Sequence, residues 1–220
     1  MIIYFIRHAN AGDTKKDLKK DDQRGLTPEG LEQCYHIARM FTKLDVVPDV
    51  ILSSSLKRAM QTAAMIANEL AYDDRLRIEK SLRPDGTWES FRSMIKSYNA
   101  ETLLVVGHNP NLEQFVGHII SESGHRAEIQ LRKAGVARVE YDGRRGELDW
   151  LLTPRMIREL DSAAQQSAAA ASKVTLPATP PKLLQVHKAI KIEKLLPAKN
   201  VKKAKKKGSK AGAKRKRKKS

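Results

Sequence analysis

Three short, uninterrupted apolar runs constrain the fold of this chain more than any other feature. They cover residues 2–6, 50–52 and 103–106, and they are rich in Ile, Val and Leu. Continuous hydrophobicity over so few residues is typical of strands buried on both faces of a parallel or mixed sheet. We therefore expect these runs to form the centre of a sheet.

Helical patterns alternate with the apolar runs. Thr27-Pro28 offers an N-cap followed by proline at the first helical position, and apolar residues then recur at helical spacing. Two more helices are expected after the serines at 53–55 and from Asn109-Pro110. A hairpin (residues 136–141 and 147–152) and a last helix from Thr153-Pro154 close the pattern. This alternation predicts an α/β fold of three layers, α/β/α, with a mostly parallel central sheet.

Each predicted strand leads into basic residues. The first gives Arg7-His8, the second leads through serines to Lys57-Arg58, and the third gives Gly107-His108. Ligands of open α/β sheets bind at the carboxyl ends of the strands. Because basic residues follow three strands that are distant in sequence, we expect them to form a common anion-binding site. Arg58 is expected in the first turn of a serine-capped helix, where the dipole disfavours a cation unless an anion lies between them.

Two histidines at adjacent strand ends favour catalysis over a structural role. No Cys, Asp or Glu near His8 and His108 completes a metal-ligand spacing, and the neighbouring arginines repel cations, so we expect neither a metal nor another cofactor. His36, His118 and His125 are expected on helix surfaces or in a loop, without a catalytic role.

Four motifs together resemble the histidine phosphatase superfamily. In chain order they are Phe5-Ile6-Arg7-His8-Ala9, Arg24-Gly25-Leu26-Thr27-Pro28-Glu29-Gly30, Ser53-Ser54-Ser55-Leu56-Lys57-Arg58-Ala59-Met60-Gln61-Thr62 and Val106-Gly107-His108-Asn109-Pro110. The compact spacing and the closing Asp149-Trp150-Leu151-Leu152-Thr153-Pro154 resemble its phosphohistidine phosphatase branch, the SixA type. The resemblance covers residues 1–160 and implies a phosphoglycerate mutase-like fold.

The resemblance implies a metal-independent phosphatase in which His8 is the nucleophile and transiently carries the phosphoryl group. Arg7, Arg58 and His108 are then expected to hold the phosphate oxygens, since guanidinium groups bind phosphate bidentately. Arg24 and Asn109 are the expected substrate-binding residues. His8 must attack as neutral imidazole, with a backbone carbonyl accepting from its other nitrogen. His108 is expected to donate as a protonated imidazole when phosphate is bound.

The sequence departs from relatives that cleave phosphate esters. Those carry a carboxylate shortly after the second helix, as proton donor to the leaving oxygen, whereas here Arg83 follows Leu82. Asp85 and Glu79 lie nearby, and whether either is a general acid stays open. A missing acid slows departure of an alkoxide by about 10²–10⁴-fold. It matters less for phosphohistidine, whose imidazole can already be protonated. The expected substrate is therefore a phosphohistidine-bearing protein.

The positive charge of the chain is concentrated near its end. Of the formal +17, residues 161–220 contribute nearly all, with 18 Lys and Arg against Asp161 and Glu193. We expect residues 1–161 to form the phosphatase domain and residues 162–220 to be an Ala/Pro/Lys-rich linker and basic tail, mostly disordered, with a short amphipathic helix over residues 182–196. Such a tail should bind polyanions such as nucleic acid or polyphosphate without sequence readout.

Other features narrow the location and leave two further functions open. The single Cys34 fits a reducing compartment and is expected to be core filler. No apolar run reaches the length of a membrane span, so a cytoplasmic protein is expected, or a nuclear one if the source is eukaryotic. The alternatives are a general phosphatase for small phosphate compounds and a polyanion-binding protein whose phosphatase-like domain is not catalytic.

Overall fold

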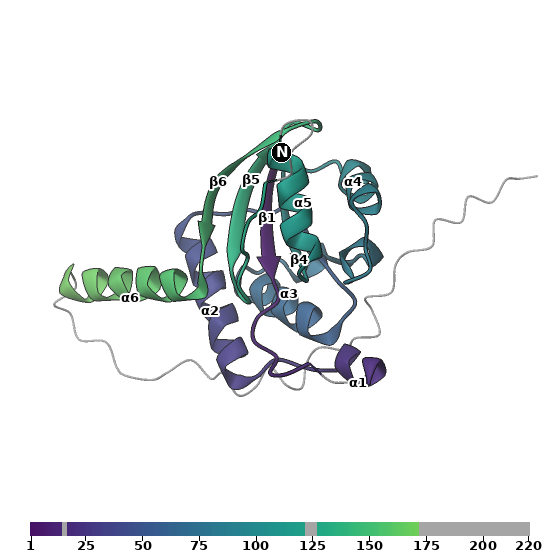
Figure 1. Cartoon of the computed structure of the whole chain (residues 1–220). Coiled ribbons are helices and arrows are strands. Elements are labelled where there is room, and N and C mark those ends of the chain that lie inside the picture. Colours follow the sequence, from purple (N-terminus) through teal and green to yellow (C-terminus); the bar gives the residue numbers. More distant parts are fainter. Residues whose placement is uncertain (15–16, 122–126, 172–220) are drawn as a thin grey trace, which may run out of the picture.

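A computed structural model describes residues 1–14, 17–121 and 127–171, so the predicted helix at 182–196 and the rest of the tail from residue 172 lie outside the described residues. One sheet forms the middle of the molecule (Figure 1). Its strand order is β3-β2-β4-β1-β5-β6. The strand bounds are β1 Ile2–Arg7, β2 Val50–Ser53, β3 Leu76–Ile78, β4 Thr102–Gly107, β5 Val136–Tyr141 and β6 Gly146–Leu152.

The sheet is mostly parallel, as predicted. β4 lies parallel to β1 on one side and to β2 on the other, and β3 continues this parallel set, whereas β5 and β6 add antiparallel pairs at the other edge. β3 escaped prediction because it is a three-residue edge strand with Arg77 at its centre, so it shows no continuous apolar run.

Helices cover both faces of the sheet, which confirms the three-layer α/β/α fold. The helix bounds are α1 Leu18–Asp22, α2 Pro28–Lys43, α3 Lys57–Glu69, α4 Trp88–Ser97, α5 Asn111–Ile120 and α6 Pro154–Ala171, with short 3-10 turns at Asp73–Arg75 and Lys80–Leu82. Tyr4 and Ile6 pack with α2 and α3, whereas Ile3 and Phe5 pack with α4 and α5. Burial on both faces explains why β1 is apolar throughout.

The helix starts follow the sequence with two differences. Thr27 caps α2 by accepting from Gly30 N at 3.1 Å, with Pro28 at the first position, as expected. The N-cap of α3 is Leu56, which makes no side-chain hydrogen bond, so the expectation of a serine cap was wrong. The third predicted helix, α5, begins at Asn111, after the proline.

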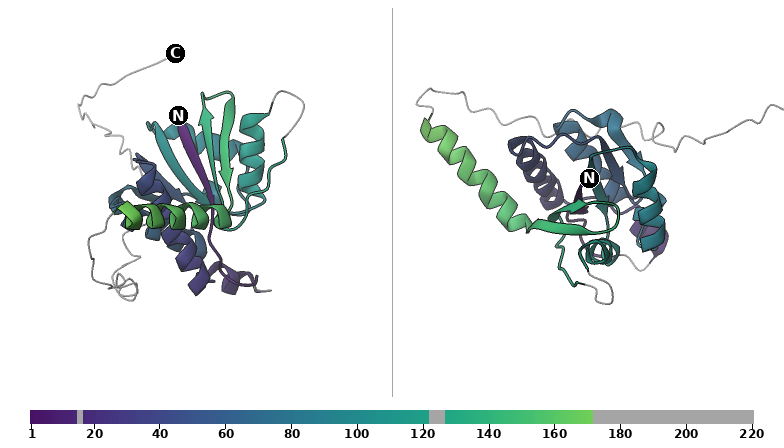
Figure 2. Two further views of the ribbon diagram at one scale, coloured as in Figure 1. Left: turned by 90° about the vertical axis from the view of Figure 1, so that its left-hand side faces the viewer. Right: turned by 90° about the horizontal axis from the view of Figure 1, so that it is seen from above.

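α6 projects from the body and continues past residue 161 (Figures 1 and 2). Asp161 is 1% exposed and is held by three side chains of α2: His36 Nδ1 at 2.9 Å, Arg39 Nε at 2.9 Å and Lys43 Nζ at 2.5 Å. His36 lies on α2, as expected, and its side chain is partly buried against Asp161. The domain boundary at residue 161 itself stays a prediction.

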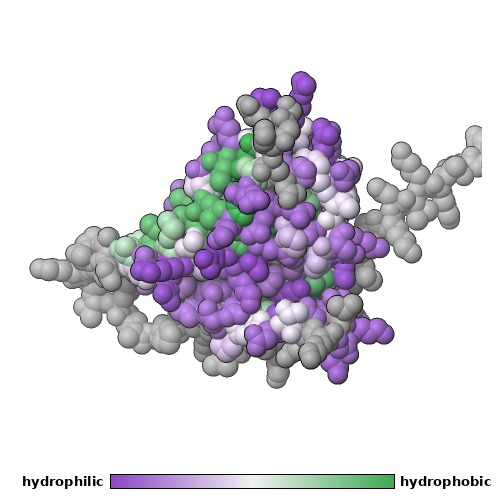
Figure 3. All heavy atoms as spheres, viewed as in Figure 1, coloured by the Kyte–Doolittle hydropathy of each residue, from purple (hydrophilic) through white to green (hydrophobic). Residues whose placement is uncertain are grey.

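The surface beside α6 carries hydrophobic side chains. Met156 and Leu160 are exposed on α6, and hydrophobic residues gather on this side of the molecule, towards β6 (Figure 3). Among the residues that the structure describes, no helix has the length and apolar character needed to cross a membrane.

Candidate active site

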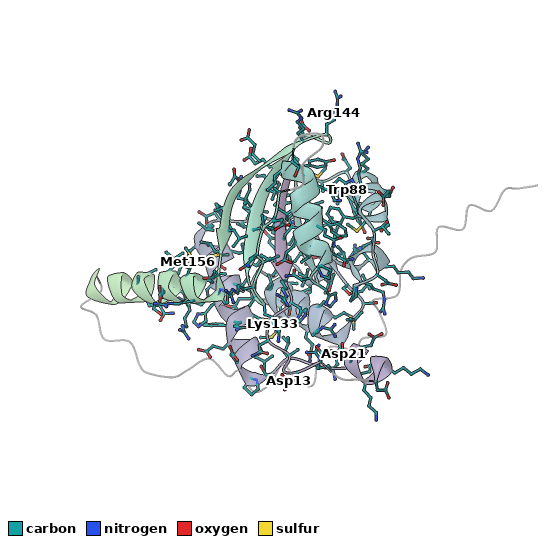
Figure 4. The ribbon with its side chains drawn as sticks, in the orientation of Figure 1. Asp13, Asp21, Trp88, Lys133, Arg144 and Met156 are labelled. Atoms are coloured by element: carbon teal, nitrogen blue, oxygen red, sulfur yellow. The ribbon has the colours of Figure 1, made fainter. Side chains whose placement is uncertain are left out.

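The two predicted catalytic histidines meet at the carboxyl edge of the sheet. Arg7 pairs with Gly107 in the parallel β1–β4 ladder, and a histidine follows each of these two residues. His8 and His108 therefore lie side by side. The backbone N–H of His8 donates to Gly107 O at 3.0 Å, and the ring centroids of His8 and His108 lie 5.0 Å apart. Asp21 and Lys133 lie at this end of the sheet, and Arg144 at the opposite end (Figure 4).

His8 is held as a neutral imidazole with a defined tautomer. Its Nδ1 lies 2.8 Å from Ala9 O, and since a carbonyl only accepts, Nδ1 carries the proton. The lone pair of Nε2 is left to accept from Arg58 Nε at 3.3 Å. Burial lowers the pKa of His8 to about 3, against the hydrogen bond to Ala9 and with help from nearby arginines. His8 therefore has the protonation state of a nucleophile.

Arg58 is a buried cation in the first turn of α3, only 5% exposed. Its Nη1 donates to Asp21 O at 2.9 Å and lies 3.2 Å from Asp21 Oδ2. Burial and the neighbouring Arg24 lower the pKa of Arg58, whereas Asp21 opposes them. The position against the helix dipole, inferred from sequence, is thus compensated in the free protein by the carboxylate of α1.

His108 faces the serines that follow β2. Its Nε2 lies 2.9 Å from Ser54 Oγ, and its buried Nδ1 has no hydrogen-bond partner among the described residues. Burial, His8 and Arg58 lower the pKa of His108 to about 2, with further contributions from Arg83 and Arg7. In the free site His108 is therefore neutral, and the expected protonated donor would need the charge of a bound phosphate.

Arg7 and Asn109 converge on one backbone carbonyl. Arg7 Nη1 donates to Leu131 O at 3.0 Å, and Asn109 Nδ2 donates to the same oxygen at 2.9 Å. Arg7 Nε and Asn109 Oδ1 are buried without a partner in the part of the chain that the structure describes. Buried polar groups of proteins are nearly always paired. Arg7 Nε, a donor, and His108 Nδ1 are therefore free to form a hydrogen bond with a ligand.

Arg24 lies next to Arg58 and is not open to solvent. Its Nε donates to Asp21 Oδ1 at 2.8 Å, and its Nη1 donates to Ala11 O at 2.9 Å and Gly12 O at 3.1 Å. Asp21, which the sequence analysis missed, thus joins Arg24 and Arg58. The only sequence signal was its position three residues before Arg24, inside a charged segment.

Thr62 was a second omission. Its Oγ1 accepts from Ala9 N at 3.1 Å and donates to Arg58 O at 2.8 Å. The side chain therefore fixes the backbone that follows His8 against α3.

The two carboxylates considered as general acids lie in different surroundings. Glu79 Oε1 accepts from Tyr98 OH at 2.5 Å, which turns it towards α4. Asp85 is exposed and lies 3.6 Å from Arg83 Nε. Arg83 itself reaches Ser55 Oγ at 3.0 Å and Asp22 Oδ2 at 3.1 Å. Arg83 is thus the charged side chain next to Ser55, whereas Asp85 lies on the solvent-exposed side of Arg83.

The cysteine and the possible metal ligands add nothing to the site in the part of the chain that the structure describes. Cys34 is buried in the core, where burial raises the pKa of its thiol to about 12. Among residues 1–14, 17–121 and 127–171, no three His, Cys, Asp or Glu side chains are grouped as metal ligands would be.

The family model of the histidine phosphatase superfamily (branch 1) matches residues 3–90, the segment that carries His8, Arg24 and Arg58. The chain belongs to this superfamily. His108 lies beyond the matched segment. An uncharacterized protein of Picosynechococcus sp. is 31% identical over 140 residues, which cover 62% of this chain and 82% of that protein.

Solved structures share the fold of this histidine phosphatase superfamily member. The protein histidine phosphatase SixA, complexed with tungstate, is 21% identical with a TM-score of 0.63, over 70% of this chain and 98% of SixA. The α-ribazole phosphatase of Shigella flexneri is 16% identical with a TM-score of 0.51, over 70% of this chain and 97% of that protein.

Proposed function

We propose that this phosphatase removes phosphate from a histidine side chain of a partner protein, through a phosphorylated His8. The observation that carries the proposal is the state of the proposed nucleophile. Nε2 of His8 keeps its lone pair at the carboxyl edge of the sheet. Arg83, whose guanidinium donates to Ser55 Oγ, follows Leu82 at the place in the sequence where ester-cleaving relatives carry their proton donor. When the other nitrogen of phosphohistidine is already protonated, the imidazole leaves as a neutral base and needs no such donor.

The first step transfers the phosphoryl group to His8. Nε2 attacks phosphorus while the bond to the substrate nitrogen breaks, and the proton on Nδ1 stays with Ala9 O. Arg58 Nε, which donates to Nε2 in the free site, turns to a phosphate oxygen, as do Arg7 Nε and His108. These donors stabilise the charge spread over the oxygens in the transition state.

Water then attacks the phosphorus of phospho-His8, and the bonding electrons return to Nε2. Both protons of the water leave with the released phosphate, because Nδ1 of His8 keeps its own proton. Asn109 and Arg24 do not need to touch the reacting atoms, because Asn109 orients the Leu131 carbonyl together with Arg7, and Arg24 holds Asp21.

The fold shared with the SixA protein supports the phosphohistidine substrate. A general phosphatase for small phosphate compounds is the second candidate, and the fold shared with the α-ribazole phosphatase favours it. The proposal places polyanion binding by the basic tail beside the catalytic function, because 18 cations lie between residue 161 and the end.

One experiment separates these functions. Phosphate release is measured from a phosphohistidine-bearing protein, a phosphoserine-bearing protein and small alkyl and aryl phosphates. We expect the phosphohistidine protein to be preferred, and brief incubation followed by an alkaline quench should trap acid-labile phosphate on His8. The matched control for His8→Ala is His118→Ala, which removes an exposed histidine of α5. Normal turnover in His8→Ala, or a preference for an alkyl phosphate, contradicts the proposal.

A further inference from the structure

Arg83 is a cation beside the site for which phosphohistidine hydrolysis has no use. Its guanidinium bridges Ser55 Oγ at 3.0 Å and Asp22 Oδ2 at 3.1 Å. Ser55 follows Ser54, the partner of His108, and Asp22 follows Asp21, the partner of Arg58. Arg83 therefore spans two segments that each hold the partner of an expected phosphate-binding side chain, and its charge contributes to the low pKa of His108.

The backbone that carries Arg83 is fixed. Its carbonyl accepts from Asn111 Nδ2 at 3.1 Å and from Gly86 N at 2.9 Å. A Cβ on Gly86 would lie 2.0 Å from Ser81 O, so this turn closes tightly only with glycine. Asn111 is buried in the first turn of α5, three residues after His108. The position of Arg83 is thus set by the same segment that positions His108.

A guanidinium cannot donate a proton to a leaving group, because it stays protonated at any physiological pH. It can bind an oxyanion bidentately. An imidazole that leaves phosphohistidine is neutral and gains nothing from a neighbouring cation. The group that fits Arg83 is one that departs as an oxyanion without a proton, and the phosphate of a phosphoanhydride has this property.

We propose that the site also hydrolyses terminal phosphoanhydride bonds, as in pyrophosphate or the end of a polyphosphate chain, and that Arg83 binds the departing phosphate. This activity rests on the proposed function, since it uses the same nucleophile. Nε2 of His8 forms a bond to the terminal phosphorus, and the bridging P–O bond breaks. The bridging oxygen keeps the electron pair and leaves as part of a phosphate anion paired with Arg83. Water then cleaves the phospho-His8 bond, the electron pair returns to Nε2, and the second phosphate leaves with both protons of the water.

Two carboxylates compete for the same guanidinium. Asp22 and Asp85 have side chains that are 40% and 82% exposed, so both can turn to solvent when an anion arrives. Asp22 is the nearer partner of Arg83, at 3.1 Å against 3.6 Å for Asp85. Its removal should therefore free Arg83 for the departing phosphate and raise affinity, the opposite of removing Arg83.

The test compares kcat/KM of the full chain for pyrophosphate and for a phosphohistidine-bearing protein. Arg83→Ala should lower the ratio of the two values by about 10–100-fold, in line with loss of a charged transition-state donor. Arg83→Lys should recover part of it, and Asp22→Asn should raise it a few-fold. Arg144→Ala, at the exposed β5–β6 turn, is the matched control and should leave the ratio unchanged.

The outcomes distinguish this inference from the proposed function. Turnover of phosphohistidine without turnover of pyrophosphate overturns only the phosphoanhydride activity. An unchanged ratio in Arg83→Ala with normal melting also overturns it, and if that variant does not fold, an unchanged or lower ratio in Asp22→Asn does so. Turnover of pyrophosphate without turnover of phosphohistidine refutes the proposed function and retains His8 and Arg83 in these roles.

Discussion

Arg58 Nε donates to His8 Nε2 at 3.3 Å, although 50 residues separate the two in sequence. The bond joins the end of a central strand to the first turn of a helix. On its other side Arg58 is held by Asp21. A phosphate that enters must therefore replace a hydrogen bond to the nucleophile, which at the same time releases the lone pair of Nε2 for attack.

Arg58→Ala should lower kcat/KM by at least about 10²-fold, because a buried donor to the transition state is lost. Arg58→Lys should restore only part, since a point charge cannot reproduce the guanidinium fork. Steady-state kinetics on phosphohistidine protein checks this, with Arg155→Ala on the exposed face of α6 as the control. Wild-type kcat/KM in Arg58→Ala would show that Arg58 does not bind the phosphoryl group.

Asp21→Asn should lower kcat/KM by about tenfold through Arg58, because Asp21 holds that guanidinium in place and need not touch the substrate. A double-mutant cycle with Arg58→Lys separates this from a general loss of structure. We expect a coupling energy of about 1–3 kcal/mol in the activation free energy. Additive effects of the two substitutions would show that Asp21 acts elsewhere.

The free energy of unfolding should fall as the pH is lowered from 7 to 5. In the folded protein the pKa values of His8 and His108 are lowered to about 3 and about 2, whereas both are near 6.5 in the unfolded chain. The unfolded chain then binds protons that the folded one does not, with a slope of up to about 1.4 kcal/mol per pH unit for each histidine.

Asp161 contributes nothing to that slope. Its pKa is lowered to about 2, so its stabilising effect is complete above the ordinary carboxylate pKa and is lost only as the pH falls through about 2. Urea unfolding at pH 7, 6 and 5 measures the slope. His108→Asn should reduce it by the share of one histidine. A slope that His108→Asn leaves unchanged would mean that His108 is charged in the folded protein.

Asp161→Asn should lower the free energy of unfolding by about 1–3 kcal/mol and leave turnover unchanged. The loss falls below that of a fully buried ion pair because His36, Arg39 and Lys43 keep some access to solvent. Glu159→Gln, on the exposed side of the same helix, is the matched control and should stay within about 0.5 kcal/mol. Equal melting of the two variants would show that this cluster does not hold α6 on α2.

A chain ending at Ala171 should keep its turnover on a small substrate and lose its affinity for polyanions, because the site lies upstream and the cations lie downstream. Affinity of the full chain for duplex DNA should fall with salt, with a logarithmic slope near −0.9 per phosphate neutralised. Binding that does not respond to salt, or loss of turnover in a well-folded truncated chain, would contradict an independent anchor.

The fold could be predicted from the sequence, because continuous apolar strands are local patterns. The residues that follow those strands predicted that His8, Arg7, Arg58 and His108 meet at one edge of the sheet. Asp21 and Thr62 could not be predicted in this way. Each forms a hydrogen bond with a residue that is distant in sequence, by 37 residues for Asp21 and by 53 for Thr62, and no local pattern encodes such a contact. β3 was missed because an edge strand buries too little to need a continuous apolar run.

The pairing of Arg7 with Gly107 fixes the two histidines that follow these residues, whereas Arg83 and its partner Asp22 lie outside the sheet. The separation of the two histidines is fixed by a hydrogen-bonded strand ladder. A shift of one residue would exchange the side chains that pack on the two faces of the sheet, so the register is strongly specified. Arg83 and Asp22 sit at the ends of a 3-10 turn and a five-residue helix, outside the hydrophobic core. Substitution of Arg83 or Asp22 can therefore alter the substrate range without moving the two histidines at the strand ends.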